Sequence, residues 1–114
     1  MQRIDRGFAL DFADALARLP TPDGKRFVEL ATHGTLSVEL YAPRGHDPQQ
    51  PHTRDEVYIV VAGSGEFSCG DARTAFVPGD LLFVPAGVAH RFERFSEDFA
   101  SWVIFYGPEG GERA

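Results

Sequence analysis

The sequence predicts an all-β domain built from short strands and turns. Apolar residues alternate with polar ones or form short runs, which is the pattern of half-buried and buried strands. Gly, Pro, Asp or Ser bound each run, and successive runs begin roughly eight to twelve residues apart, as in sandwiches and barrels. Twelve Gly and ten Phe among 114 residues also suit strands and turns better than a helical bundle.

The composition is that of one globular domain, because 114 residues suffice for a single core. A formal net charge of -6 repels phosphate backbones, so nucleic-acid binding is not expected. The longest apolar run, residues 57–62, is too short to span a membrane. The N-terminus does not show the basic residues and following apolar stretch of a secretion signal, so secretion is not expected. Cys69 is the single cysteine and cannot form an intramolecular disulfide. We therefore expect a cytoplasmic protein without a membrane partner.

One short N-terminal helix is predicted over residues 8–19. Its apolar residues recur at helical spacing, and they are Phe8, Phe12, Ala15, Leu16 and Leu19. Pro20 and Pro22 end the helix because neither has an amide proton to extend the hydrogen-bond ladder. Residues 1–25 are thus expected to form a helical segment that packs on the barrel.

Eight strands are predicted after this segment. The first two, residues 26–32 and 35–41, form a hairpin across His33-Gly34, and residues 43–55 form a proline-containing loop. The other predicted strands cover residues 56–62, 65–69, 73–77, 81–84, 88–95 and 99–106. The barrel is therefore expected over residues 26–106, and the Gly-containing residues 107–114 are expected to form a flexible tail.

Two of the four histidines lie where they can contribute to a metal site. Gln50 and His52 face the same side of an extended chain. Glu56 shares their parity but lies about 13 Å beyond His52 along a straight strand, so it joins them only if the chain bends between them. His90 follows a Pro-Ala-Gly turn. These side chains suit Zn, Fe, Mn, Ni or Cu if they face inward, and are ordinary surface residues if they face outward.

Two stretches resemble the two motifs of the cupin superfamily. The first is QPHTRDEVYIVVAG, residues 50–63, in which His52, Glu56 and Gly63 have the motif spacing. The second is GDLLFVPAGVAH, residues 79–90, in which the spacing is matched by Gly79, Pro85, Gly87 and His90. With the strand pattern, the resemblance covers about residues 26–106. It implies a double-stranded β-helix, or jelly-roll, barrel with a metal ion inside.

By position in the motifs, the resemblance implies that one divalent metal ion per chain is held by Gln50, His52, Glu56 and His90. Gln50 stands where the family has a histidine, and Arg94 stands where it has an asparagine. Gly45 is one residue late for the leading glycine. Gln49 and His46 are the substitutes for Gln50 if the loop is shifted by a few residues.

Three functions remain open. The first is a metal-dependent dioxygenase, isomerase or decarboxylase acting on a small acid or sugar derivative inside the barrel. The second is binding of such a molecule without turnover, and the third is a metal-free structural barrel. No general base is identified apart from the expected metal ligands.

The residues expected to contact the small-molecule ligand are Tyr58, Phe92 and Arg94. The alternative for Tyr58 and Phe92, which their aromatic character favours, is that they fill the interior of the barrel. Arg94 shares the parity of His90 and is a candidate to orient a carboxylate. Cupins are often dimers through an edge strand, so a homodimer is expected as one alternative, with residues 99–106 as its candidate interface.

Overall fold

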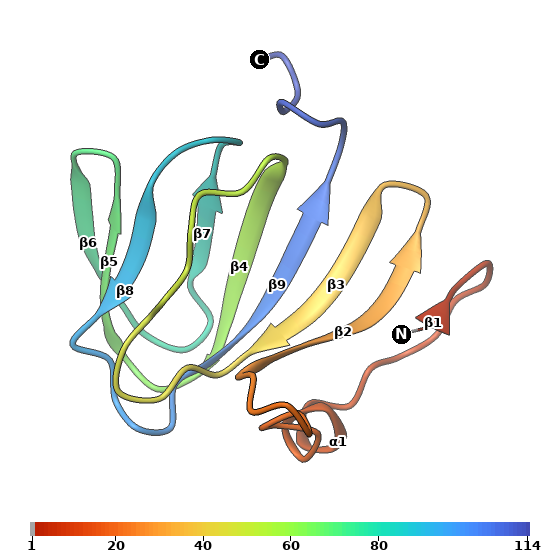
Figure 1. Ribbon diagram of the computed structural model, residues 1–114, viewed down its shortest axis with the longest axis horizontal. Coiled ribbons are helices and arrows are strands. Elements are labelled where there is room, and N and C mark those ends of the chain that lie inside the picture. Colours follow the sequence, from red (N-terminus) through yellow and green to blue (C-terminus); the bar gives the residue numbers. More distant parts are fainter. Residues whose placement is uncertain (1) are drawn as a thin grey trace.

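The computed structural model describes residues 2–114 as two facing β-sheets with almost no helix (Figure 1). The larger sheet has the strand order β1-β2-β3-β9-β4-β7, and the smaller has the order β6-β5-β8. The strands are β1 Gln2–Arg3, β2 Phe27–His33, β3 Leu36–Tyr41, β4 Asp55–Ala62, β5 Gly65–Cys69, β6 Ala72–Phe76, β7 Leu81–Val84, β8 His90–Glu93 and β9 Ala100–Tyr106. The predicted all-β class is confirmed.

The N-terminal helix predicted over residues 8–19 is wrong. Helical geometry is confined to α1, Phe12–Leu16, which has five residues. It begins where it does because Asp11 is extended and its side chain accepts a hydrogen bond of 2.9 Å from the Asp14 amide. It ends because the next amides bond to carbonyls only three residues earlier, as the Leu19 amide does to Leu16.

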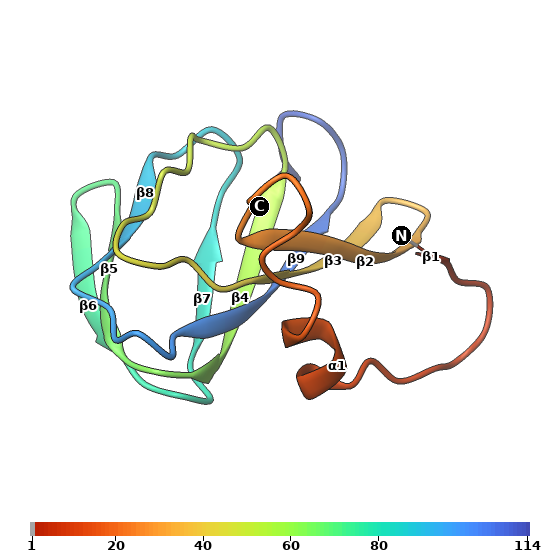
Figure 2. The same cartoon turned by 60° about the horizontal axis from the view of Figure 1, so that its bottom comes forward.

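The larger sheet has an apolar core on each face. Between the sheets, side chains of both pack into a cluster formed by Tyr41, Tyr58, Val60, Phe67, Phe76, Leu82, Val84, Phe92, Phe99 and Val103. On the opposite face, α1 contributes Ala15 to a second cluster with Leu30 and Leu40 (Figure 2). Because neighbouring residues of a strand face opposite sides, β3 supplies Tyr41 to one core and Leu40 to the other.

The sequence predicts a closed barrel, and this prediction is also wrong. Within residues 2–114, the strands of each sheet pair only with strands of the same sheet. The smaller sheet has three strands, and its side chains pack mainly against β4, β7 and β9. The inner face of β2 and β3 is therefore left open at one end. The β3–β4 connection bridges the sheets there, since the Phe92 amide of β8 donates to Asp47 Oδ2 at 2.8 Å.

The C-terminal segment, expected to be flexible, is hydrogen-bonded as far as Glu112. The Gly110 amide donates to the Thr53 carbonyl at 2.7 Å, and the Glu112 amide donates to Asp55 Oδ2 at 2.8 Å. These bonds hold the segment against the start of β4. In the part of the chain described, no helix has the length and apolar character needed to cross a bilayer.

Leu40→Ala is expected to lower the free energy of unfolding by about 3 kcal/mol, because the side chain is fully buried beneath α1. Leu81→Ala is the matched control, since Leu81 is 63% exposed and its truncation should change stability by less than about 0.5 kcal/mol. Urea unfolding of both variants measures the difference. Equal losses would show that the second core contributes little.

Candidate metal centre and ligand pocket

His52, Glu56 and His90 converge in the structure. Glu56 Oε1 lies 3.2 Å from His90 Nε2, and Glu56 Oε2 lies 3.8 Å from His52 Nε2. One ligand atom from each residue lies within 4.8 Å of the other two. The sequence required a bend between His52 and Glu56 for both to reach one metal ion. That bend is present at Thr53 and Arg54, and it brings His52 back over β4. The three residues form a candidate metal site.

The turn before β8 holds the bend in place. The Gly87 amide donates to the His52 carbonyl at 2.7 Å, and the Ala86 amide donates to Asp55 Oδ1 at 2.9 Å. Gly87 has a φ of 80°, which a residue with a Cβ rarely adopts. The Pro-Ala-Gly turn of the second motif is thus joined by one backbone hydrogen bond to the histidine of the first, and by a second hydrogen bond to the side chain of Asp55.

The ring of His90 is oriented by the backbone. Its Nδ1 lies 2.9 Å from the Val88 carbonyl and donates to it, because a carbonyl oxygen can only accept. Nε2 therefore faces the Glu56 carboxylate and the Tyr58 hydroxyl, which is 3.1 Å away. Burial opposes charge on this ring, but the neighbouring Glu56 carboxylate and the Val88 carbonyl raise the pKa of His90 above its ordinary value.

Glu56 is the group of the site whose burial most needs a compensating partner. It is 1% exposed, and neither carboxylate oxygen has a hydrogen-bond donor within residues 2–114. A buried carboxylate without a partner costs several kcal/mol. A proton on His90 relieves part of this cost, and a divalent cation held by the same atoms relieves more. The donor set therefore fits a metal ion.

A network of polar groups positions a fourth candidate ligand group, the side-chain carbonyl of Gln49. Asp47 is 5% exposed and accepts from the Tyr41 hydroxyl at 2.5 Å and from Gln49 Nε2 at 2.8 Å. With its amide nitrogen held in this way, Gln49 directs Oε1 toward the site. That oxygen lies 3.3 Å from His52 Nε2 and accepts from the Tyr58 hydroxyl at 2.7 Å.

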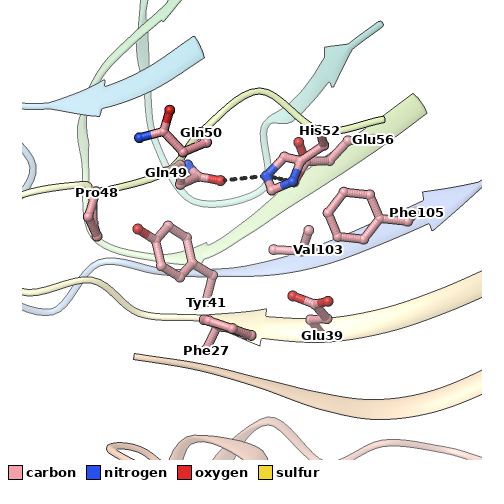
Figure 3. A pocket seen from close by; sticks show the side chains of 10 residues that line it. All are labelled: Phe27, Glu39, Tyr41, Pro48, Gln49, Gln50, His52, Glu56, Val103 and Phe105. Atoms are coloured by element: carbon pink, nitrogen blue, oxygen red, sulfur yellow. Dashed lines mark hydrogen bonds and ion pairs between the residues drawn. The ribbon is translucent and has the colours of Figure 1, made fainter. Parts of the chain in front are cut away.

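The structure does not bring Gln50 to the other candidate ligands. Gln50 is exposed, and its amide points away from His52, whereas Gln49 points toward it (Figure 3). The parity argument fails here because this loop, with Pro48 and Pro51, is not an extended strand. Gln49, the alternative for a shifted loop, is the glutamine that contacts the site.

The three residues expected to contact ligand lie in different places. Phe92 is 1% exposed within the core. Arg94 is on the surface, where its Nη1 pairs with Glu66 Oε1 at 2.8 Å, because β8 ends at Glu93 and the positive φ of Arg94 breaks the strand parity. Tyr58 is buried, but its hydroxyl reaches His90, so only Tyr58 is at the metal site.

A cavity of about 330 Å³ opens beside this cluster (Figure 3). Its volume is at the lower end of the range for small-molecule sites, about 300–1,000 Å³. Most of its wall is apolar or aromatic, and no Lys or Arg is among its lining residues in the part of the chain described. The lining residues are Phe27, Glu39, Tyr41, Pro48, Gln49, Gln50, His52, Glu56, Val103 and Phe105.

Glu39 is the residue of this pocket that sequence reasoning missed. Burial, together with the like charges of Glu29 and Glu56 and against the opposing charge of Arg54, raises the pKa of its carboxyl to about 7. The signal in the sequence was its parity with Tyr41 on one face of the predicted strand. Alternation alone does not say which face of a strand is the inner one.

The comparisons with known proteins agree with this architecture. Residues 37–106 match the model of the cupin domain. The protein belongs to the cupin family. An uncharacterised protein of Streptomyces coelicolor is 40% identical to it over 85 residues, which is 73% of this chain and 81% of that protein.

Two further similarities are more limited. Acireductone dioxygenase of Drosophila pseudoobscura pseudoobscura is 42% identical over 53 residues, which is 42% of this cupin and 28% of that enzyme. The chain thus spans less than a third of that relative. A cupin-2 domain-containing protein of Shewanella frigidimarina superposes with a TM-score of 0.68 at 20% identity, covering 86% of this chain and 94% of that one. At that identity the superposition shows the fold alone.

Glu39→Gln is expected to change how stability depends on pH. The folded protein holds the Glu39 proton up to about pH 7, whereas the unfolded chain releases it near 4.5. The folded state then binds more protons between these values, so stability falls as the pH rises through this window. The loss is at most about 3 kcal/mol, and Glu39→Gln should remove it.

Urea unfolding at pH 5 and pH 8, with a chelator present, measures this change for the wild type and the variant. The matched control is Glu97→Gln, which removes the same charge from an exposed position. If wild type and Glu39→Gln lose stability equally between the two pH values, the Glu39 carboxyl is not perturbed.

Proposed function

We propose that this cupin binds one divalent metal ion through His52, Glu56 and His90, with the carbonyl oxygen of Gln49 as a fourth ligand. The observation that carries the proposal is the Glu56 carboxylate, which is buried without a hydrogen-bond donor and faces both imidazoles. Without a metal ion, the partner left to that carboxylate is a proton on His90, whose Nε2 lies 3.2 Å from Oε1. Imidazole and carboxylate donors suit Zn, Fe, Mn, Ni or Cu.

The proposed function of this site is to bind a small oxygenated organic molecule in the adjoining cavity. When bound, the metal would act as a Lewis acid toward an oxygen atom of the ligand. One carboxylate against two positive charges leaves the centre net positive, which favours an anionic or carbonyl oxygen. The apolar wall excludes water from the remainder of the ligand.

The protein's own residues fix the geometry for such a ligand. The Val88 carbonyl holds His90 Nδ1, so that Nε2 faces the centre. Asp47 holds the amide of Gln49, and the Tyr58 hydroxyl lies between Gln49 and His90. Burial and the Glu56 charge raise the pKa of Tyr58 well above its usual range, so this hydroxyl keeps its proton and acts as a donor.

The similarity to acireductone dioxygenase favours turnover of a small oxygenated substrate by this chain over binding alone. The matched segment is less than half of this chain, so the reaction itself is part of the proposal. Consumption of dioxygen by the Fe(II)-loaded protein with a small oxygenated acid would support a dioxygenase. Ligand binding without product would support the binding function.

His52→Ala and His90→Ala are each expected to abolish stoichiometric metal binding. Saturation with metal at a hundred times its Kd stabilises the wild type by about 2.7 kcal/mol, and both variants should lose this effect. Elemental analysis and thermal unfolding with added Zn²⁺ measure the two quantities. His46→Ala is the matched control because His46 is exposed. Retention of metal by both variants would disprove the site.

Gln49→Ala is expected to weaken Zn²⁺ binding by about tenfold or more, as loss of a group that touches a metal ligand commonly does. Gln50→Ala should leave the affinity within about twofold, because Gln50 points away from the histidines. Calorimetric titration of the two variants with Zn²⁺ shows which of the two neighbouring glutamines is the metal ligand. The reverse order would return Gln50 to the ligand set.

A further inference from the structure

The cavity contains a second carboxyl group that the candidate metal site does not use. Glu39 lies on β3, and its carboxylate is directed into the space beneath His52 and Glu56 (Figure 3). On β3 it stands between Glu29 of β2 and Val103 of β9, its cross-strand neighbours. It therefore lines the wall of the cavity formed by the larger sheet.

The carboxylate of Glu39 has no close counter-ion in the described part of the chain. Within residues 2–114, no Lys, Arg or His nitrogen lies within 4.0 Å of its carboxylate. Arg54 is the nearby cation, but its guanidinium donates to the Thr35 carbonyl and lies 5.9 Å from the centre of the Phe105 ring. The other charged neighbours, Glu29 and Glu56, carry the same sign as Glu39.

This arrangement constrains what the cavity can bind. A half-buried carboxylate without a counter-ion is unfavourable, and the raised pKa of Glu39 is one expression of that cost. A ligand that brings a positive or hydrogen-bond-donating group supplies the missing partner. A ligand that brings a second anionic group meets Glu39 in a cavity without a lining Lys or Arg.

We propose that Glu39 determines the ligand specificity of the cavity. It selects molecules that present an oxygen ligand to the metal at one end and an ammonium group at the other, and it excludes dianionic molecules. A hydroxyl in place of the ammonium group binds more weakly because its hydrogen bond lacks the charge. This inference rests on the proposed metal site, which supplies the partner for the oxygen end.

The test uses three series of probes on the Zn²⁺-loaded protein at pH 8. The ω-amino acids are β-alanine, 4-aminobutanoate and 5-aminopentanoate. Propanoate, butanoate and pentanoate lack the ammonium group, and succinate, glutarate and adipate replace it with a second carboxylate. The carbon chain varies in length within each series, so that one member can match the spacing between the metal and Glu39. Calorimetric titration measures each affinity.

For at least one length, the wild type should bind the ω-amino acid about tenfold more tightly than the monocarboxylate, as a charge-assisted hydrogen bond would provide. The dicarboxylate of that length should bind most weakly. In Glu39→Gln both differences should shrink to within about twofold, because the amide is uncharged. Glu97→Gln, which removes an exposed charge of the same kind, should retain the wild-type order.

The failures of the two proposals are distinguishable. Zn²⁺ titration without any probe tests the metal site alone. If Zn²⁺ does not bind in that titration, the proposed function is overturned. If Zn²⁺ binds but no ω-amino acid is preferred at any length, the specificity proposal is overturned. An unchanged preference in Glu39→Gln, or no binding of any of the nine probes to the Zn²⁺ form, also overturns it.

Discussion

The burial of one carboxylate is the constraint on which the rest of the site depends. Glu56 is enclosed between the two sheets, and nothing in the described part of the chain donates a hydrogen bond to it. A charge in that position is tolerated only beside a cation. The His90 ring is held by the Val88 carbonyl, the backbone of His52 is held by Gly87, and both rings lie where they can share such a cation with Glu56. The candidate metal site thus compensates an otherwise unfavourable feature of the core.

The open arrangement of the two sheets explains where this site lies. The larger sheet provides Glu56 and Glu39, and the smaller sheet provides His90. The connection between β3 and β4 begins and ends in the larger sheet, contacts β8 of the smaller sheet through Asp47, and carries Gln49 and His52. Because three strands do not cover six, the inner face of β2 and β3 borders a cavity instead of a packed core.

Asp47 has a central part in this connection, although it does not itself contact His52, Glu56 or His90. Its buried carboxylate accepts from the Tyr41 hydroxyl, the Gln49 amide and the Phe92 backbone amide. These bonds join β3, the loop and β8. A loop without regular backbone pairing needs such contacts to hold a side chain in one place, and this is why Gln49 has a defined position.

The strands and three candidate metal ligands could be predicted from the sequence. All eight strands predicted from residue 26 onward are present, because alternation and bounding turns depend on neighbouring residues. The resemblance to the cupin motifs pointed to His52, Glu56 and His90, although His90 lies on the other sheet from Glu56. The two-residue strand β1 was missed because it is too short to show a period.

The remaining features were decided by contacts that neither strand alternation nor motif spacing shows. The helix shrank to Phe12–Leu16 because the Asp11 cap and the turn after Leu16 outweighed the apolar period. Gln49 replaced Gln50 because Asp47 holds its amide, and Arg94 turned to Glu66 because the strand ends before it. The sequence by itself determined the strands, and its resemblance to the cupin motifs supplied three of the candidate metal ligands. Which carboxyl faces the cavity depended on how the two sheets pack, since strand alternation defines two faces without saying which is covered.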